Sequence, residues 1–170
     1  MKISALVFAV GSFVFAAQSA LAVNPFSLPW VNGPARDSVY HTADHADGIF
    51  ILEAFQNFCP HCHNNAPAVD ALYTKYKDQA RVQVLDLDLD TDQSEVTAWI
   101  DQYHPAYPVI QDSSREVWNQ LGGDGGIPMT VVMDCKGNIK YTTEGEWDDG
   151  AKADIAKAID ALLATPCAAN

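Results

Sequence analysis

The chain has 170 residues, of which 48% are hydrophobic, and its formal net charge is −12 at pH 7. This length is enough for one domain with a sizeable core. The acidic balance disfavours binding to phosphate backbones and to anionic lipid heads, so we predict no nucleic acid partner.

The N-terminus has the pattern of a secretory signal peptide. Lys2 precedes an apolar run over residues 3–17, and Ala20-Leu21-Ala22 supplies small residues for a cleavage site. An uncleaved anchor is the alternative, but a membrane span needs about 20 apolar residues. We predict a signal peptide over residues 1–22, cleavage after Ala22, and export to the periplasm. Export together with an even number of cysteines indicates an oxidising compartment.

Residues 23–47 form the predicted N-terminal lead segment, which is rich in Pro, Asn, Asp and His. One short strand is expected at 38–41. His41 and His45 have the spacing of one helix face, but the residues around them favour a turn. We interpret both as surface histidines and predict no metal site.

Residues 49–56 are predicted to form a central strand, because the run is almost continuously apolar. Glu53 is the exception in this run. A buried carboxylate is costly unless it has a partner or a task. Glu53 either faces solvent or serves as a proton acceptor near Cys62. The run alone leaves both interpretations open.

Cys59-Pro60-His61-Cys62 follows this strand and opens a predicted helix. A thiolate at a helix start is stabilised by unpaired backbone N–H groups and by the helix dipole. Pro60 suits the first helical turn, where its missing N–H costs nothing. His61 adds a donor or a positive charge close to Cys59. The pattern predicts a redox-active dithiol with Cys59 as the attacking, more exposed sulfur.

Other interpretations of the Cys59 and Cys62 pair are a structural disulfide, half of a zinc site, or two buried thiols. Zinc needs four ligands, and only His61 and His63 are near in sequence. These two histidines are predicted to lie on different sides of the helix. Redox chemistry is therefore the favoured interpretation.

Residues 81–90 form the next predicted strand, in which leucines alternate with Asp86, Asp88 and Asp90. An EF-hand calcium loop is excluded, because Thr91 stands where such a loop needs glycine. We predict a strand end with a solvated acidic face.

The remaining pattern gives two helices around a short strand, then two strands joined by a tight turn, then a last helix. The predicted ranges are 94–103, 107–111, 114–121, 129–134, 139–143 and a helix that starts after Asp148 or Asp149. This order implies a mixed sheet covered by helices on both faces. The predicted domain spans residues 48–170.

The apolar strand followed by C-x-x-C resembles the thioredoxin superfamily. The run ILEAFQNFCPHC, with its Pro60-His61 pair and with Phe58 before the first cysteine, resembles the periplasmic oxidase DsbA. The resemblance implies an α/β thioredoxin fold with one extra βα unit before Ile127-Pro128. It also implies that Glu53, six residues before Cys59, is the buried acid beneath the disulfide, and it favours Glu53 as the proton acceptor near Cys62.

The same resemblance assigns a role to Ile127 and Pro128. In these families the proline is cis and faces the disulfide, and the residue before it pairs its backbone with the substrate chain. The interval from Cys59 to Pro128 is longer than in plain thioredoxins and much shorter than in DsbA. It resembles the exported TlpA and ResA group, which typically reduces disulfides.

Cys135 and Cys167 form a second predicted pair. Cys135 falls in the turn between two strands, and Cys167 follows the last helix. We predict a structural disulfide, because the protein is expected to be exported. Two free thiols are the alternative.

We expect an exported thiol–disulfide oxidoreductase without a cofactor. It would act on cysteine-containing proteins and exchange electrons with a membrane or periplasmic redox partner. His61 and the helix start favour an oxidising pair, while a TlpA/ResA-like reductase is the first alternative. A copper metallochaperone is an alternative from another class. A peroxiredoxin is disfavoured, because residues 54–58 lack the Pro and Thr of its motif.

Overall fold

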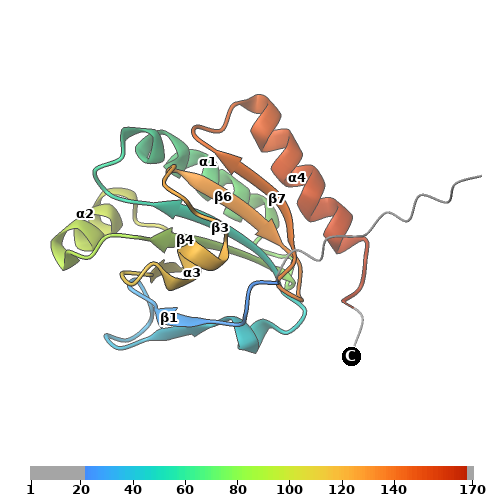
Figure 1. Cartoon of the computed structure of the whole chain (residues 1–170), viewed down its shortest axis with the longest axis horizontal. Helices are drawn as coiled ribbons and strands as arrows, with labels where there is room; N and C mark the ends of the chain where they lie inside the picture. Colours follow the sequence, from blue (N-terminus) through green and yellow to red (C-terminus); the bar gives the residue numbers. More distant parts are fainter. Residues whose placement is uncertain (1–21, 168–170) are drawn as a thin grey trace, which may run out of the picture.

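The computed structural model describes residues 22–167; the predicted signal peptide up to residue 21 and residues 168–170 lie outside the described residues. A central sheet is covered by helices on one face and by a helix and a small hairpin on the other (Figure 1). The elements are β1 (Ser27–Pro29), β2 (Val39–His41), the 3-10 helix η1 (Thr42–His45), β3 (Ile49–Phe55), α1 (Pro60–Tyr76), β4 (Val82–Asp88), α2 (Gln93–Tyr103), β5 (Val109–Gln111), α3 (Glu116–Gln120), β6 (Met129–Met133), β7 (Ile139–Glu144) and α4 (Asp149–Leu163).

The main sheet has the strand order β5-β4-β3-β6-β7. Strands β4 and β5 run parallel to β3, whereas β6 and β7 run antiparallel to their neighbours. This confirms the predicted mixed sheet. Strand β5 adds one more parallel strand at the edge of the sheet beside β4.

The core lies on both faces of β3, in which every residue is buried. One face packs against α1 and α4 through Val69, Leu72 and Ile155. The opposite face packs against α3 and the N-terminal hairpin. A strand that is covered on both faces reads as a continuous apolar run, which explains why β3 was the clearest strand in the sequence.

The N-terminal lead holds one strand more than predicted. The expected strand at 38–41 is confirmed as β2, and β1 pairs with it antiparallel. Phe26 and Tyr40, on and beside this hairpin, are buried in the core. Strand β1 has only three residues and ends in Pro29, so it carries too little alternation to be recognised.

The prediction of a solvated acidic face on β4 was wrong. Asp86, Asp88 and Asp90 are 1%, 0% and 5% exposed. Strand β4 is internal, with β3 on one side and β5 on the other, and α2 packs over the aspartate face. An alternating pattern shows that the two faces of a strand differ, but it does not show that the polar face meets water.

Within residues 22–167, no helix has the length and apolar character needed to cross a membrane.

Candidate active site

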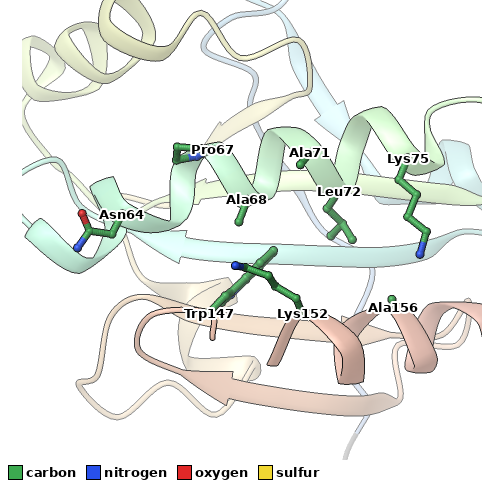
Figure 2. Close-up of a pocket in the computed structure, with 9 residues that line it drawn as sticks. All are labelled: Asn64, Pro67, Ala68, Ala71, Leu72, Lys75, Trp147, Lys152 and Ala156. Atoms are coloured by element: carbon green, nitrogen blue, oxygen red, sulfur yellow. The ribbon is translucent and has the colours of Figure 1, made fainter. Parts of the chain in front are cut away.

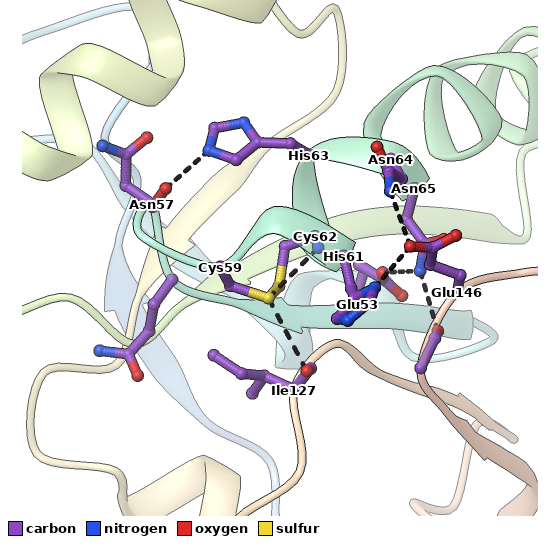
Figure 3. The surroundings of a disulfide bond; sticks show 12 residues. Glu53, Asn57, Cys59, His61, Cys62, His63, Asn64, Asn65, Ile127 and Glu146 are labelled. Carbon is purple, nitrogen blue, oxygen red and sulfur yellow. Dashed lines mark hydrogen bonds and ion pairs between the residues drawn. A yellow bond between two sulfur atoms is a disulfide. The ribbon is translucent and has the colours of Figure 1, made fainter.

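Cys59 and Cys62 are joined by a disulfide at the start of α1 (Figure 3). Cys59 is the N-cap of the helix, and its Sγ accepts the backbone N–H of Cys62 at 3.2 Å. Pro60 occupies the first turn, as predicted. The sulfurs therefore sit where backbone donors and the helix dipole favour negative charge.

Both sulfur-bearing residues are largely covered. Cys59 is 4% exposed and Cys62 is 2% exposed, whereas the neighbouring Phe58 is 71% exposed. The Sγ of Cys59 lies 3.7 Å from the carbonyl oxygen of Ile127. The Ile127–Pro128 peptide bond is cis. The structure thus brings the carbonyl of Ile127, which is expected to pair with substrate, close to the sulfur that is expected to attack.

Glu53 faces the protein interior and is 4% exposed. Its carboxylate accepts the amide of Asn65 at 2.8 Å and the hydroxyl of Thr130, which in turn accepts the indole N–H of Trp147 at 2.7 Å. Burial raises the pKa of Glu53 to about 7, although its hydrogen bonds act in the opposite direction. Its bonds within residues 22–167 go to these side chains and not to either sulfur. The role of Glu53 as a proton acceptor for Cys62 therefore stays a prediction.

His61 is held by a residue that the sequence did not single out. Its Nδ1 lies 2.5 Å from Oε1 of Glu146, and the amide of Asn64 donates to the same oxygen at 2.6 Å. The His61 bond, and then the Asn64 bond, holds the pKa of Glu146 below its usual value. The carboxylate offsets part of any positive charge on His61, and this weakens its effect on the thiolate.

His63 points to the other side of the helix, as predicted (Figure 3). Its ring bonds the hydroxyl of Tyr103 at 2.6 Å and the carbonyl of Asn57 at 2.7 Å, and it packs against Trp99. His63 thus anchors the loop before Cys59. Among the described residues, no group of three or more His, Cys, Asp or Glu side chains is placed to bind a metal.

Some of the residues that support Glu53 and His61 are near the C-x-x-C motif in sequence and others are far from it. Asn65 follows Cys62 by one helical turn, and this spacing was a signal that could have been used. Glu146, Thr130 and Trp147 come from or follow the two antiparallel strands, so only the closed sheet brings them to the helix start.

A groove of about 560 Å³ lies between α1 and α4, next to this site (Figure 2). Its lining is mostly apolar, with Lys75 and Lys152 also present. It contains neither active-site cysteine. Trp147 is the residue that contributes both to the groove and to the surroundings of Glu53.

Cys135 and Cys167 form a second disulfide, which joins the turn between β6 and β7 to the segment after α4. Both residues line a small pocket with Ile49, the first residue of β3. Cys59 follows the last residues of the same strand. The two disulfides therefore lie at opposite ends of β3, and a structural role for the second one remains a prediction.

The fold and this site define the class: a thioredoxin-fold protein with a C-x-x-C disulfide at a helix start. Residues 22–142 match the AhpC/TSA family, and the chain belongs to this family. The peroxiredoxin motif is nevertheless absent from residues 54–58.

The curated relatives include several proteins named thiol-disulfide oxidoreductase ResA. The one from Bacillus thuringiensis strain Al Hakam is 28% identical over 99 residues, which is 58% of this chain and 56% of that protein. The one from Geobacillus thermodenitrificans is 21% identical over 95% of this chain and 90% of that protein. The chain thus spans only a little over half of the first of these relatives.

Solved structures confirm the fold. StoA from Bacillus subtilis has a TM-score of 0.66 and 18% identity, covering 81% of this chain and 97% of that chain. A thiol:disulfide interchange protein of the thioredoxin family from Chlorobium tepidum has a TM-score of 0.69 and 20% identity, covering 84% and 95%. At these identities the likeness speaks for the fold alone.

Proposed function

We propose that this protein is an exported thiol–disulfide oxidoreductase that exchanges disulfides with cysteine-containing proteins through Cys59 and Cys62. The observation that carries the proposal is the disulfide at the start of α1, with Cys59 Sγ 3.7 Å from the carbonyl of Ile127. The names of the ResA relatives support the same activity.

The reducing reaction begins from the dithiol. The Cys59 thiolate attacks one sulfur of a substrate disulfide, and the other substrate sulfur leaves as a thiolate. Cys62 then loses its proton, with Glu53 as the proposed acceptor, and attacks Cys59. The substrate is released with two reduced sulfurs, and the Cys59–Cys62 disulfide remains. The oxidising reaction is the same sequence in reverse.

Substrate would bind over the exposed side of the disulfide. Phe58 offers an apolar contact there, because it is one of the few large hydrophobic side chains exposed among residues 22–167. The backbone of Ile127 would pair with an extended substrate segment beside Cys59. A segment that binds in this way brings its own sulfur to the Sγ of Cys59.

We propose that the reducing direction is the one used by this protein. The expectation of an oxidising pair depended on His61 as a stabiliser of the Cys59 thiolate, and Glu146 offsets that charge. The helix start still favours the thiolate, so oxidation remains the second candidate.

The reduction potential of the Cys59–Cys62 pair tests both the activity and its direction. Equilibration with glutathione, with Cys135 and Cys167 quantified separately, should give a value near or below about −250 mV. A value near or above about −180 mV would assign the protein to the oxidases and isomerases. If the wild-type protein exchanged disulfides no faster than the Cys59→Ser control, the proposed oxidoreductase activity would be refuted.

We also propose that residues 1–22 are a cleaved signal peptide and that residues 48–170 form the thioredoxin-like domain after the lead at 23–47. Pairing of all four cysteines suits a periplasmic location and a membrane or periplasmic redox partner. Mass spectrometry of the protein from a periplasmic extract should give a chain that begins at Val23. An intact N-terminus would contradict the cleavage.

A further inference from the structure

A row of polar side chains crosses the sheet beneath the disulfide. Thr130 on β6, Glu53 on β3 and Asp86 on β4 are register partners, so their side chains share one face of the sheet. Ile51 and Phe55 flank Glu53 on that face and belong to two separate apolar clusters, of which the second contains both active-site cysteines. The row therefore lies in an apolar interior.

Asp86 has few partners for a buried carboxyl. The indole N–H of Trp99 and the hydroxyl of Tyr107 both donate to its Oδ2, at 3.2 and 3.3 Å. Its Oδ1 is buried and has no hydrogen-bond partner among residues 22–167. An ionised carboxylate would leave this oxygen unsatisfied, whereas a protonated one can carry its hydrogen there.

No cation balances the two carboxyls, since neither forms an ion pair within residues 22–167. The other titratable groups that act on Asp86 are Asp88 on the same strand and Tyr107 before β5. Asp70 on α1 acts in turn on Tyr107. Burial, and then the charge of Glu53, raises the pKa of Asp86 well above its usual value. Burial raises the pKa of Asp88 to about 7, and burial also raises that of Tyr107.

We propose that Asp86 is a second buried acid of the active site. Asp86 and Glu53 share one proton, and this proton stays on the pair when Glu53 ionises. Two adjacent carboxyls without a cation cannot both be charged at little cost. The inference rests on the proposed oxidoreductase function. In it, Asp86 is a positioning residue, because it keeps a proton next to Glu53.

The retained proton has a defined use. When a substrate thiolate attacks Cys59 Sγ, a new sulfur–sulfur bond forms and the Cys59–Cys62 bond breaks. The electron pair moves to Cys62 Sγ, which then takes the proton from the carboxyl pair. In the opposite direction Cys62 returns the proton as its sulfur attacks Cys59 in the mixed disulfide. No other reactant is required.

Carbon-13 NMR titration of the side-chain carboxyls in the oxidised wild-type protein tests the pair directly. We expect Glu53 to titrate near pH 7, with Asp86 still protonated at that point. The Glu53→Gln variant should shift the midpoint of Asp86 to lower pH, because it removes the neighbouring charge. The exposed Asp101→Asn variant is the control and should shift neither. Ionisation of Asp86 before Glu53, or no shift in Glu53→Gln, would overturn the pair.

The use of the proton is tested by the rate at which dithiothreitol reduces the Cys59–Cys62 disulfide, corrected for the fraction of thiolate reagent. Above pH 7, Asp86→Asn should be slower than wild type by about tenfold, since Glu53 alone has then lost its proton. Asp101→Asn should match wild type at every pH. If folded Asp86→Asn showed the same pH dependence of the reduction rate as wild type, the role of Asp86 would be refuted. Disulfide exchange by the wild-type protein would still support the proposed function. If Asp86→Asn fails to fold, the wild-type titration still decides whether the pair exists.

Discussion

At the scale of single residues, the site is governed by charges that oppose one another. His61 lies inside the C-x-x-C ring, where a positive charge would favour the Cys59 thiolate. Glu146 lies 2.5 Å from its ring, on a side that remains open to solvent. Glu146, which lies outside the motif, therefore weakens the stabilisation of the Cys59 thiolate that His61 would provide.

The Glu146→Gln variant should make the Cys59–Cys62 pair more oxidising. The amide preserves the size of the side chain but removes the negative charge that offsets His61. We expect the equilibrium constant with glutathione to shift by about threefold toward the dithiol, a small change because both side chains are exposed. Glu144→Gln, an exposed change on β7, should leave the constant unaltered. Equal constants for all three proteins would mean that Glu146 does not tune the pair.

At the scale of elements, the second disulfide joins two segments that are not hydrogen-bonded to each other within the sheet. It ties the β6–β7 turn to the end of α4, which reaches the core through Ile155 and Ile159. The loop that it closes spans a sequence separation of 32, against 3 for Cys59–Cys62. Closing the longer loop removes more conformational freedom from the unfolded chain.

Replacing Cys135 and Cys167 together by alanine should lower the free energy of unfolding by about 3–4 kcal/mol in the chain-entropy account. Urea unfolding of the oxidised proteins measures this loss. The double variant Cys59→Ala with Cys62→Ala is the matched control, and it should lose less because its loop is short. A loss that is equal or smaller in the Cys135 and Cys167 variant would contradict a structural role for this bond.

At the scale of the whole molecule, an acidic chain also carries acids in its core. The pKa values of Glu53 and Asp88 rise from 4.5 and 3.8 to about 7, mainly through burial. In the unfolded chain both groups ionise near their ordinary values. Between about pH 4 and pH 7 the folded state therefore binds more protons than the unfolded state, and raising the pH favours unfolding.

The free energy of unfolding should consequently fall between about pH 4 and pH 7, with Glu53 contributing roughly 3 kcal/mol over its full window. Urea unfolding across this range measures the slope. Glu53→Gln cannot ionise, so its slope should be shallower than that of wild type. Stability that is constant or that rises with pH would show that these carboxyls are already ionised in the folded protein.

Much of this organisation was predictable from local patterns. Strand β3 was recognised from its apolar run, and α1 from the cysteines and Pro60 at its start. The mixed sheet followed from the order of the elements. The roles assigned to Glu53 and Ile127 came from a family resemblance, and they await the experiments above.

From residue 49 onward, the sequence by itself determined which elements form, their order, and the disulfide motif at the helix start, because these depend on neighbours along the chain. Only the tertiary structure decided that Asp86 is buried beside Glu53 and that Glu146 reaches His61. Burial and charge contacts depend on which elements cover each face of the sheet. That covering is set by packing between segments far apart in sequence, and no local pattern records it.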